Sequence, residues 1–527
     1  MLLSEFIVIS EYIWPFNDRL KFPQNMNPPD QLAQLIGLGL YKSVNILSSF
    51  IEHPNARVLI QRARAYAELK NYNAAIKTLD SIERITRSEE EINEILELRL
   101  TCYLNMNNSA AKCASLLPHL VNRILTPKLH ILVARAYIIQ DSSHSPNHPA
   151  VHHLMEVLKI YPLAIELVED LLFVGAPIKD ILSHIPQSCA KIYMQSLHHT
   201  YHSEFKQAIE CFSENIINII PTPTCVLNRI CINAMLSGEM TLFDSTAAQL
   251  PLDDLEIIDL RASRLKQLKK TDELTNLVQI ALNTDEFHAN SWLAFSHLLE
   301  MNGDHQKALQ ATRKELLIDR FSRRGFMRHG DLRVQRNDTR KALTAYTKAH
   351  QLHEGVDSFS AIVQCCCMLE DWKTAEAFAA KALLAYPASS EHGADSIIMM
   401  GLAMRSRDPA TAINLLKTAL EKSPSNNTAL NALIGIKVKE DDLEAAERFL
   451  REYREQNRDF YYYLKLGEIY SLKRDYQKAL EFVATAARFD PTNERAKDML
   501  EQLESLIRDN DSSDGFDDGE EDMPFFA

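Results

Sequence analysis

Residues 460–491 read FYYYLKLGEIYSLKRDYQKALEFVATAARFDP, and this stretch decides the fold of the chain. Apolar residues recur at helical spacing in two runs, 463–472 and 477–489, which are separated by a polar turn. The small residues Gly467 and Ala479 stand where two such helices would approach each other closely. The stretch therefore predicts two helices that pack together as one pair.

The order of residue types is that of the tetratricopeptide repeat: a bulky residue, Leu-Gly, Tyr, Ala, Ala and a final Pro. These positions are filled by Tyr463, Leu466, Gly467, Tyr470, Ala479, Ala486 and Pro491. The same frame begins upstream at Ala289, Arg323, Val356, Gly393 and Asn427, and the successive spacings up to Phe460 are 34, 33, 37, 34 and 33 residues. We predict an all-α fold, a tetratricopeptide-repeat superhelical solenoid of about a dozen helix pairs.

The quality of this frame divides the chain into segments. Residues 1–28 are rich in apolar and aromatic residues and in Pro, and permit a strand, a helix or an extended segment. Further helical repeats fill 29–187, degenerate middle copies fill 188–288, and the clear array with a capping helix from Glu494 fills 289–508. Residues 509–527 form an acidic tail with eight Asp or Glu between 509 and 522, which we expect to be disordered.

Composition limits the class of protein. At 527 residues the chain is longer than one hydrophobic core usually supports, whereas stacked repeats avoid that limit. A net charge of −14 argues against general binding to nucleic acid, and no apolar run is long enough to predict a membrane span. The start of the chain does not read as a secretory signal. Nine scattered Cys indicate reduced thiols in the cytosol or nucleus.

Three clusters in the sequence contain residue types that can bind a metal or react. Two are His clusters that could in principle hold a metal, and one is a run of Cys. They are His198, His199 and His202; His148, His152 and His153; and Cys365, Cys366 and Cys367. The His clusters lack further ligands at suitable spacing and read as surface histidines, and the Cys run reads as core packing. We predict no catalytic residue, no cofactor and no metal site.

Residues 313–341 are basic, with ten Lys or Arg against four Asp or Glu, a balance of 10 − 4 = +6. In an array of this kind the first helix of each repeat lines a concave groove. The frame places on that side Asn290, Leu293, His297, Arg324, Met327, Asp331, Ser360 and Gln364. One interpretation is a groove that takes an acidic or extended partner segment, with Arg324 as a carboxylate clamp. The other is a solvated outer face, or pairing with the acidic tail.

The predicted helix over residues 30–51 carries a wide apolar face. The candidate interface residues on it are Leu40, Val44, Leu47 and Ile51. The pattern itself fits two interpretations equally well: a cap over the first repeat, or a self-complementary dimer surface.

Four stretches resemble one known family, that of subunit 7 of the anaphase-promoting complex. They are GLGLYKSVNILSSFI (37–51), LTPKLHILVARAY (125–137), KIYPLAIELVEDLL (159–172) and YYLKLGEIYSLKRDYQKALEFVATAARFDPTN (462–493). The similarity extends over roughly residues 30–522, and the order of the divergent N-terminal pieces is its most specific part. Residues 1–28 are an addition to the family pattern.

The resemblance implies a non-catalytic scaffold subunit of a ubiquitin ligase that acts in mitosis, located in the nucleus and cytoplasm. It also implies a homodimer formed through the N-terminal repeats, in contact with sister repeat subunits of the complex. From the charge and hydropathy of the chain we expect no nucleic-acid or membrane partner. Two alternatives from other classes are a repeat adaptor for chaperone or trafficking partners and the regulatory arm of a transferase.

Overall fold

The computed structural model describes residues 28–49, 51, 54–82, 88–106, 110–120, 123–141, 145–213, 222–424, 426–454, 458–491 and 493–513. In these residues the regular structure is helical throughout: twenty-nine α-helices and one short 3-10 helix, with no strand. The prediction of an all-α fold is therefore confirmed. Most of the 1–28 segment and residues 514–527 of the acidic tail lie outside the described residues.

The helices fall into two compact units. The first comprises residues up to 201 together with 207–222. Its helices are α1 (Pro28–Gly37), α2 (Tyr41–Ser49), α3 (Ala56–Glu68), α4 (Tyr72–Ser81), α5 (Glu89–Leu104), α6 (Ala110–Leu116), α7 (Pro127–Gln140), α8 (Pro149–Ile160), α9 (Ile165–Val174), α10 (Ile178–Ser183), α11 (Cys189–Tyr201) and most of α12 (Phe205–Ser213), with the 3-10 helix Leu117–His119 after α6.

The second unit comprises residues 202–206 and the chain from 223 onward. Its helices are α13 (Thr224–Ser237), α14 (Met240–Ala247), α15 (Ile258–Gln267), α16 (Thr271–Thr284), α17 (Ala289–Met301), α18 (His305–Ile318), α19 (Arg323–Gln335), α20 (Thr339–Leu352), α21 (Val356–Met368), α22 (Trp372–Ala385), α23 (Gly393–Met404), α24 (Pro409–Lys422), α25 (Asn427–Lys439), α26 (Leu443–Arg454), α27 (Phe460–Leu472), α28 (Tyr476–Phe489) and α29 (Glu494–Ser513). The segment 188–288, predicted as one region, is thus divided between the two units.

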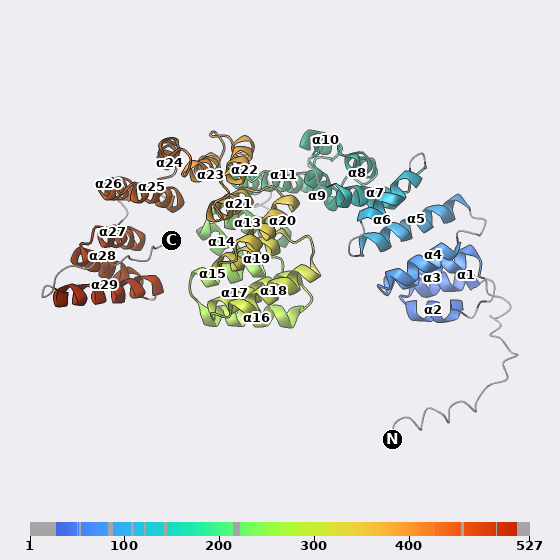
Figure 1. Ribbon diagram of the computed structural model, residues 1–527. Coiled ribbons are helices and arrows are strands. Elements are labelled where there is room, and N and C mark those ends of the chain that lie inside the picture. Colours follow the sequence, from blue (N-terminus) through green and yellow to red (C-terminus); the bar gives the residue numbers. More distant parts are fainter. Residues whose placement is uncertain are drawn as a thin grey trace, which may run out of the picture. The chain divides into compact units, whose positions relative to one another are not determined.

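The predicted repeat frame coincides with the helix starts. The first helices α17, α19, α21, α23, α25 and α27 begin at the six residues that the frame marks, Ala289 to Phe460. Each packs against the helix that follows it, as α27 does against α28 and α17 against α18 (Figure 1). The described residues contain fourteen successive pairs, and α29 packs against α28 after the last of them.

The turns inside several of the pairs share one geometry. In four of these turns one residue has a left-handed backbone conformation. The φ angles are 58° at Asn337, 59° at Glu370, 59° at Asp441 and 62° at Arg474. The next backbone N–H then bonds back to the first helix, as Asp475 N does to Tyr470 O at 3.1 Å. This closure satisfies carbonyls at the end of the first helix and reverses the chain.

Close approach of the two helices depends on a small residue in the first helix. A Cβ placed on Gly467 of α27 would lie 2.3 Å from Val483 Cγ2 of α28. At the same repeat position, a Cβ on Gly330 would meet the Tyr346 ring at 2.3 Å, and one on Gly401 would meet Leu416 at 2.9 Å. Gly467 thus lies at a close approach of two helices, where a larger side chain would collide with α28.

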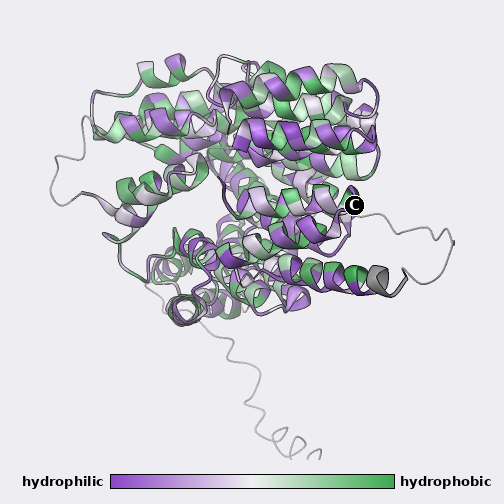
Figure 2. Cartoon of the chain, turned by 90° about the vertical axis from the view of Figure 1, so that its left-hand side faces the viewer, coloured by the Kyte–Doolittle hydropathy of each residue, from purple (hydrophilic) through white to green (hydrophobic). Residues whose placement is uncertain are grey.

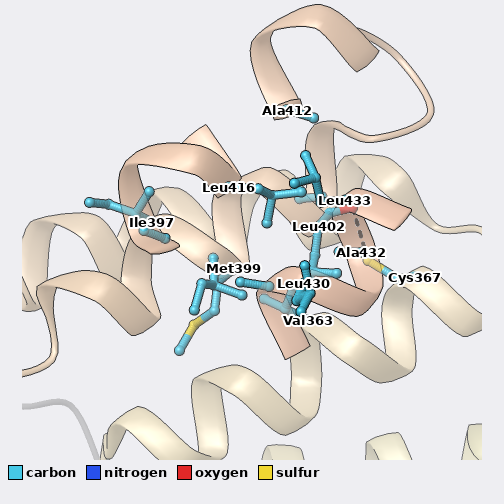
Figure 3. Packing of buried hydrophobic residues seen from close by; sticks show 14 of the residues in the cluster. Val363, Cys367, Ile397, Met399, Leu402, Ala412, Leu416, Leu430, Ala432 and Leu433 are labelled. Atoms are coloured by element: carbon cyan, nitrogen blue, oxygen red, sulfur yellow. Dashed lines mark hydrogen bonds between the residues drawn. The ribbon is translucent and has the colours of Figure 1, made fainter. Parts of the chain in front are cut away.

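The core of the second unit runs without a break through several repeats. One cluster of buried side chains joins α20 to α27 and includes all three consecutive thiols, Cys365, Cys366 and Cys367. Part of this cluster is drawn in Figure 3, where Cys367 Sγ donates to Leu402 O at 3.6 Å. Hydrophobic and hydrophilic residues share each helix (Figure 2), as expected when each pair buries one face against its neighbours.

Two boundaries differ from the sequence prediction. The helix predicted over 30–51 is interrupted: α1 ends at Gly37, and α2 begins at Tyr41 after a turn in which Gly39 has a φ of 73°. At the other end α29 continues to Ser513, so residues 509–513, assigned to the disordered tail, are helical. The first helix breaks because a left-handed glycine turn lets α1 and α2 both pack against α3.

Candidate binding surface

The first helices of successive pairs form the surface that the sequence predicts as a groove, and we call it the first-helix face. On this face Arg324 of α19 is already paired. Its Nη1 donates to both carboxylate oxygens of Asp259 of α15, each at 2.9 Å. The Asp259 side chain is 5% exposed and that of Arg324 is 39% exposed. The predicted carboxylate clamp is therefore occupied by a carboxylate of this chain.

A buried polar network adjoins this pair. The Arg328 guanidinium of α19 binds the Glu300 carboxylate of α17 and also donates to the hydroxyl of Ser296 at 3.1 Å. Lys266 Nζ lies 2.5 Å from Glu300 Oε2, and Gln335 Nε2 donates to Oε1 at 2.5 Å. Burial alone would raise the pKa of Glu300, but these partners hold it at about 2, so the carboxylate stays ionised.

The network joins the first helices of three successive repeats, α15, α17 and α19. Charged side chains that are buried and paired in this way fix the relative positions of their helices, since removal of one partner leaves an uncompensated charge. The first-helix face between Asp259 and Gln335 is consequently built as a rigid polar surface.

The remaining groove candidates have different environments. The Asn290 amide donates to the backbone carbonyl of Leu255 at 2.9 Å, which ties α17 to the loop before α15. Burial lowers the pKa of His297 well below its ordinary value, so its ring is neutral at physiological pH. Met327 packs against the core cluster. Gln364 is exposed and donates to Ser360 Oγ at 3.0 Å.

The basic stretch 313–341 is used largely inside the chain. Five of its ten cations form ion pairs with acidic residues of the described structure. They are Arg323 with Asp357, Arg324 with Asp259, Arg328 with Glu300, and Arg333 and Lys341 with Asp338. In addition, Lys314 Nζ lies 4.1 Å from the centre of the Trp292 ring. Contacts within the chain thus account for much of the positive charge of this stretch. The sequence had offered two interpretations of that charge, a partner-binding groove or a solvated outer face.

The four candidate interface residues of the N-terminus do not form one exposed face. Val44 is fully buried in a cluster with Leu32 and Val58, and Leu47 and Ile51 pack against the same cluster. Leu40, in the turn between α1 and α2, is 47% exposed. The four residues therefore largely cap the first repeats, and a dimer interface at this end remains a prediction.

The other clusters singled out from the sequence are placed as follows. His148 begins α8, and its Nδ1 accepts a hydrogen bond from Ala150 N at 3.1 Å. His153 Nδ1 lies 2.9 Å from His130 Nδ1, and burial lowers the pKa of His153 to about 4. Burial raises the pKa of Cys365 and Cys366 to about 11, which keeps both thiols protonated. Among the described residues no group of three or more His, Cys, Asp or Glu is arranged to hold a metal ion.

Within the described part of the chain, no helix has both the length and the apolar character that crossing a bilayer requires.

Successive helix pairs of this length, with a left-handed turn inside most of them and a glycine at the close crossings of α19, α23 and α27, are typical of a tetratricopeptide-repeat protein. Models of the tetratricopeptide repeat match residues 56–99, 403–466 and 460–493. The predicted fold class is therefore confirmed by the structure and by sequence comparison.

The chain is also similar, over most of its length, to two proteins that share the same name. "Anaphase-promoting complex subunit 7" of Arabidopsis thaliana is 23% identical over 551 residues, which cover 92% of this chain and 96% of the relative. The protein of the same name from Dictyostelium discoideum is 20% identical over 431 residues, which cover 77% of this chain and 73% of the relative. The resemblance that the sequence suggested is thus confirmed.

A solved structure shares the fold. The crystal structure of the APC/C hetero-tetramer Cut9-Hcn1 matches with a TM-score of 0.54 and 14% sequence identity, over 90% of this chain and 96% of that chain. This likeness concerns the arrangement of helices alone.

Proposed function

We propose that this chain is a non-catalytic scaffold subunit of an anaphase-promoting complex, a ubiquitin ligase that controls mitosis through protein degradation. The observation that carries the proposal is the end-to-end match with the Arabidopsis relative, which covers 92% of one chain and 96% of the other. A block of repeats shared with unrelated proteins would align over part of the chain only. The similarity instead includes the degenerate repeats, whose sequences follow no general consensus.

The mechanism of such a subunit is binding. Each helix pair contacts its neighbours, and the stack presents a long surface for other proteins. In the second unit that surface is held in place by the pairs Arg324–Asp259 and Arg328–Glu300. A surface that is rigid before binding loses less conformational entropy when a partner docks. Sister repeat subunits of the complex are the partners that this function requires.

The proposal extends to the assembly and location of the chain. It includes a homodimer formed through the N-terminal repeats, and a distribution between nucleus and cytoplasm. Exposed apolar residues at this end support the dimer: Leu38 and Leu40, in the turn between α1 and α2, are 72% and 47% exposed, and Ile46 of α2 is 58% exposed. Apolar side chains that gather at one end of a soluble chain favour an interface there.

The adaptor alternative loses its main support. Recognition of an acidic C-terminus by a chaperone adaptor would need Arg324 as a free clamp, but Arg324 Nη1 is bound to Asp259.

A reconstituted ubiquitin-conjugation assay tests the proposal. The ligase complex is purified from cells with and without this chain, and the purified chain is assayed alone. We expect the chain alone to transfer no ubiquitin. We expect the complex without it to lose associated repeat subunits while its catalytic core still forms ubiquitin chains. Transfer by the isolated chain would assign it to an enzyme class and refute the scaffold function.

A further inference from the structure

The first-helix face contains a cavity of about 220 Å³ beyond the polar network. The first two turns of α21 and α23 and the start of α25, which are three successive first helices, line it. Pockets for whole small molecules usually measure about 300–1,000 Å³. The cavity therefore has the size for one side chain of a larger partner.

The floor of the cavity is apolar and its rim is acidic. Ile398 and Met399 of α23 contribute the apolar part, being 4% and 2% exposed, and both belong to the core cluster in which Figure 3 shows Met399. The rim has two carboxylates, Asp357 of α21 and Asp395 of α23, with side chains 40% and 41% exposed. The hydroxyl of Ser360 also lines the cavity. The lining thus combines apolar contact with hydrogen-bond acceptors.

The two carboxylates differ in how far the chain itself neutralises them. Both oxygens of Asp357 are bound by the Arg323 guanidinium, which makes a neutral pair. Asp395 Oδ2 lies 3.1 Å from His392 Nδ1, and within the described residues its Oδ1 accepts no hydrogen bond. Among those residues no Lys or Arg lines the cavity. A carboxylate oxygen at the rim is consequently available to a cation from outside.

We propose that this cavity binds the side chain of one Lys or Arg from an extended segment of a partner protein. The aliphatic stem would lie on Ile398 and Met399, and the cationic head would bind Asp395, with the Ser360 hydroxyl as a further acceptor. The inference concerns the chain itself and holds whichever complex the chain enters.

Small amino-acid probes test this site on the full-length purified chain. The probes are N-acetyl-arginine amide and N-acetyl-citrulline amide, which match in shape while only the first is charged, with binding followed by saturation-transfer NMR. The proposal predicts that the arginine compound binds about tenfold more tightly than the citrulline compound, because the uncharged citrulline cannot form the charge-assisted contact. Equal binding of the two compounds, or no binding by either, overturns it.

Two variants locate the binding. Asp395→Asn removes the charge, and we expect it to weaken binding of the arginine compound about tenfold. Because Asp395 also contacts His392, a second variant is needed that leaves this contact intact. Thr428 lies at an exposed position on the cavity rim, and Thr428→Lys places an ammonium group there that blocks binding of the probe. Glu421→Gln, on the exposed side of α24, is the matched control and keeps full binding. If both rim variants, verified as folded by circular dichroism, bind as the control does, the site lies elsewhere.

Discussion

Gly467 of α27 and Val483 of α28 approach so closely that even a methyl group at residue 467 would come within 2.3 Å of Val483 Cγ2. Ala479, fully buried on α28, forms the other side of the same contact, since its carbonyl oxygen would lie 3.4 Å from that methyl group. The distance between the two helices is therefore set by small side chains.

Ala479→Leu should overpack this helix pair. We expect the free energy of unfolding to fall by about 1–3 kcal/mol, because the larger side chain forces α27 and α28 apart. Urea denaturation followed by circular dichroism measures the change. Gln477→Leu, at an exposed position on the same helix, is the control and should change stability by less than about 0.5 kcal/mol. Equal stability of Ala479→Leu and the native chain would show that the helices are not held this closely.

Arg328→Met should destabilise the second unit by about 3 kcal/mol, because it leaves the Glu300 carboxylate without its main partner in a buried site. The double variant Arg328→Met, Glu300→Leu should recover part of this loss, since the buried charge is removed as well. Thermal unfolding of both variants measures the difference. Arg340→Met, at an exposed position, serves as the control. A double variant less stable than the single one would contradict the network as described.

The same pair predicts the acid limit of stability. The pKa of Glu300 is held at about 2 in the folded chain, below its ordinary value of 4.5. For a depressed carboxyl the stabilisation is complete above the unfolded pKa and is lost as the pH falls through the folded one. We therefore expect native stability to decline between about pH 4.5 and pH 2, and Glu300→Gln to show a flatter decline over that window in equilibrium unfolding.

Glu315→Gln should stabilise the chain at neutral pH. Glu315 of α18 is fully buried, and burial, only partly offset by the Ser322 hydroxyl, raises its pKa to about 8. Unfolding then releases a proton between the unfolded pKa and pH 8, so this group lowers stability as the pH rises through that range. A neutral amide removes the cost, and we expect a gain of about 1–3 kcal/mol at pH 7.5.

The measurement for Glu315→Gln is the pH profile of the unfolding midpoint between pH 5 and pH 8. The gain should shrink toward pH 5, because this pH lies close to the unfolded pKa of 4.5 and the protonation states of the folded and unfolded carboxyl then differ less. Glu501→Gln, which is exposed on α29, is the control and should leave the profile unchanged. A gain of the same size at pH 5 and pH 7.5 would exclude ionisation of Glu315 as its cause.

The N-terminal surface yields a further test. Replacing the exposed Leu38, Leu40 and Ile46 by Asp should give monomers of unchanged helicity in sedimentation, because these side chains face solvent in one copy. Val44→Asp should instead unfold the first pair, at a cost of about 3 kcal/mol or more, since Val44 is fully buried against α3. A triple variant that sediments as an intact dimer would place the interface elsewhere.

The repeat frame was predictable because it depends on local chemistry. Gly467, Ala479 and their counterparts recur at fixed spacing, so each helix start followed from short-range pattern alone. The partner of Arg324 was not predictable in this way: Asp259 lies 65 residues earlier, and no local spacing rule joins the two. Likewise the break between α1 and α2 depends on packing against α3, whereas the pattern over 30–51 fits one amphipathic helix.

The residues of the candidate cavity were likewise only partly predictable from the sequence. Ser360 was placed on the groove side by its position in the repeat. Asp395 and Met399, by contrast, lie in a poorer copy of the frame, which begins at Gly393 after a spacing of 37 residues. Their common surface exists only because α21, α23 and α25 pack in succession. The signal that would have found them is an acidic residue in the first turn of neighbouring first helices.

The central claim is that this chain works as a part of a larger assembly held together by its stacked helix pairs. The most direct measurement replaces the chromosomal copy by an affinity-tagged one, fractionates the extract by size under native conditions, and identifies what co-elutes. The account predicts that the chain is recovered in a complex far larger than its own 60.0 kDa, together with other subunits of an anaphase-promoting complex in constant ratio. Recovery of the chain alone as a monomer or dimer, or with chaperones in place of ligase subunits, would contradict it.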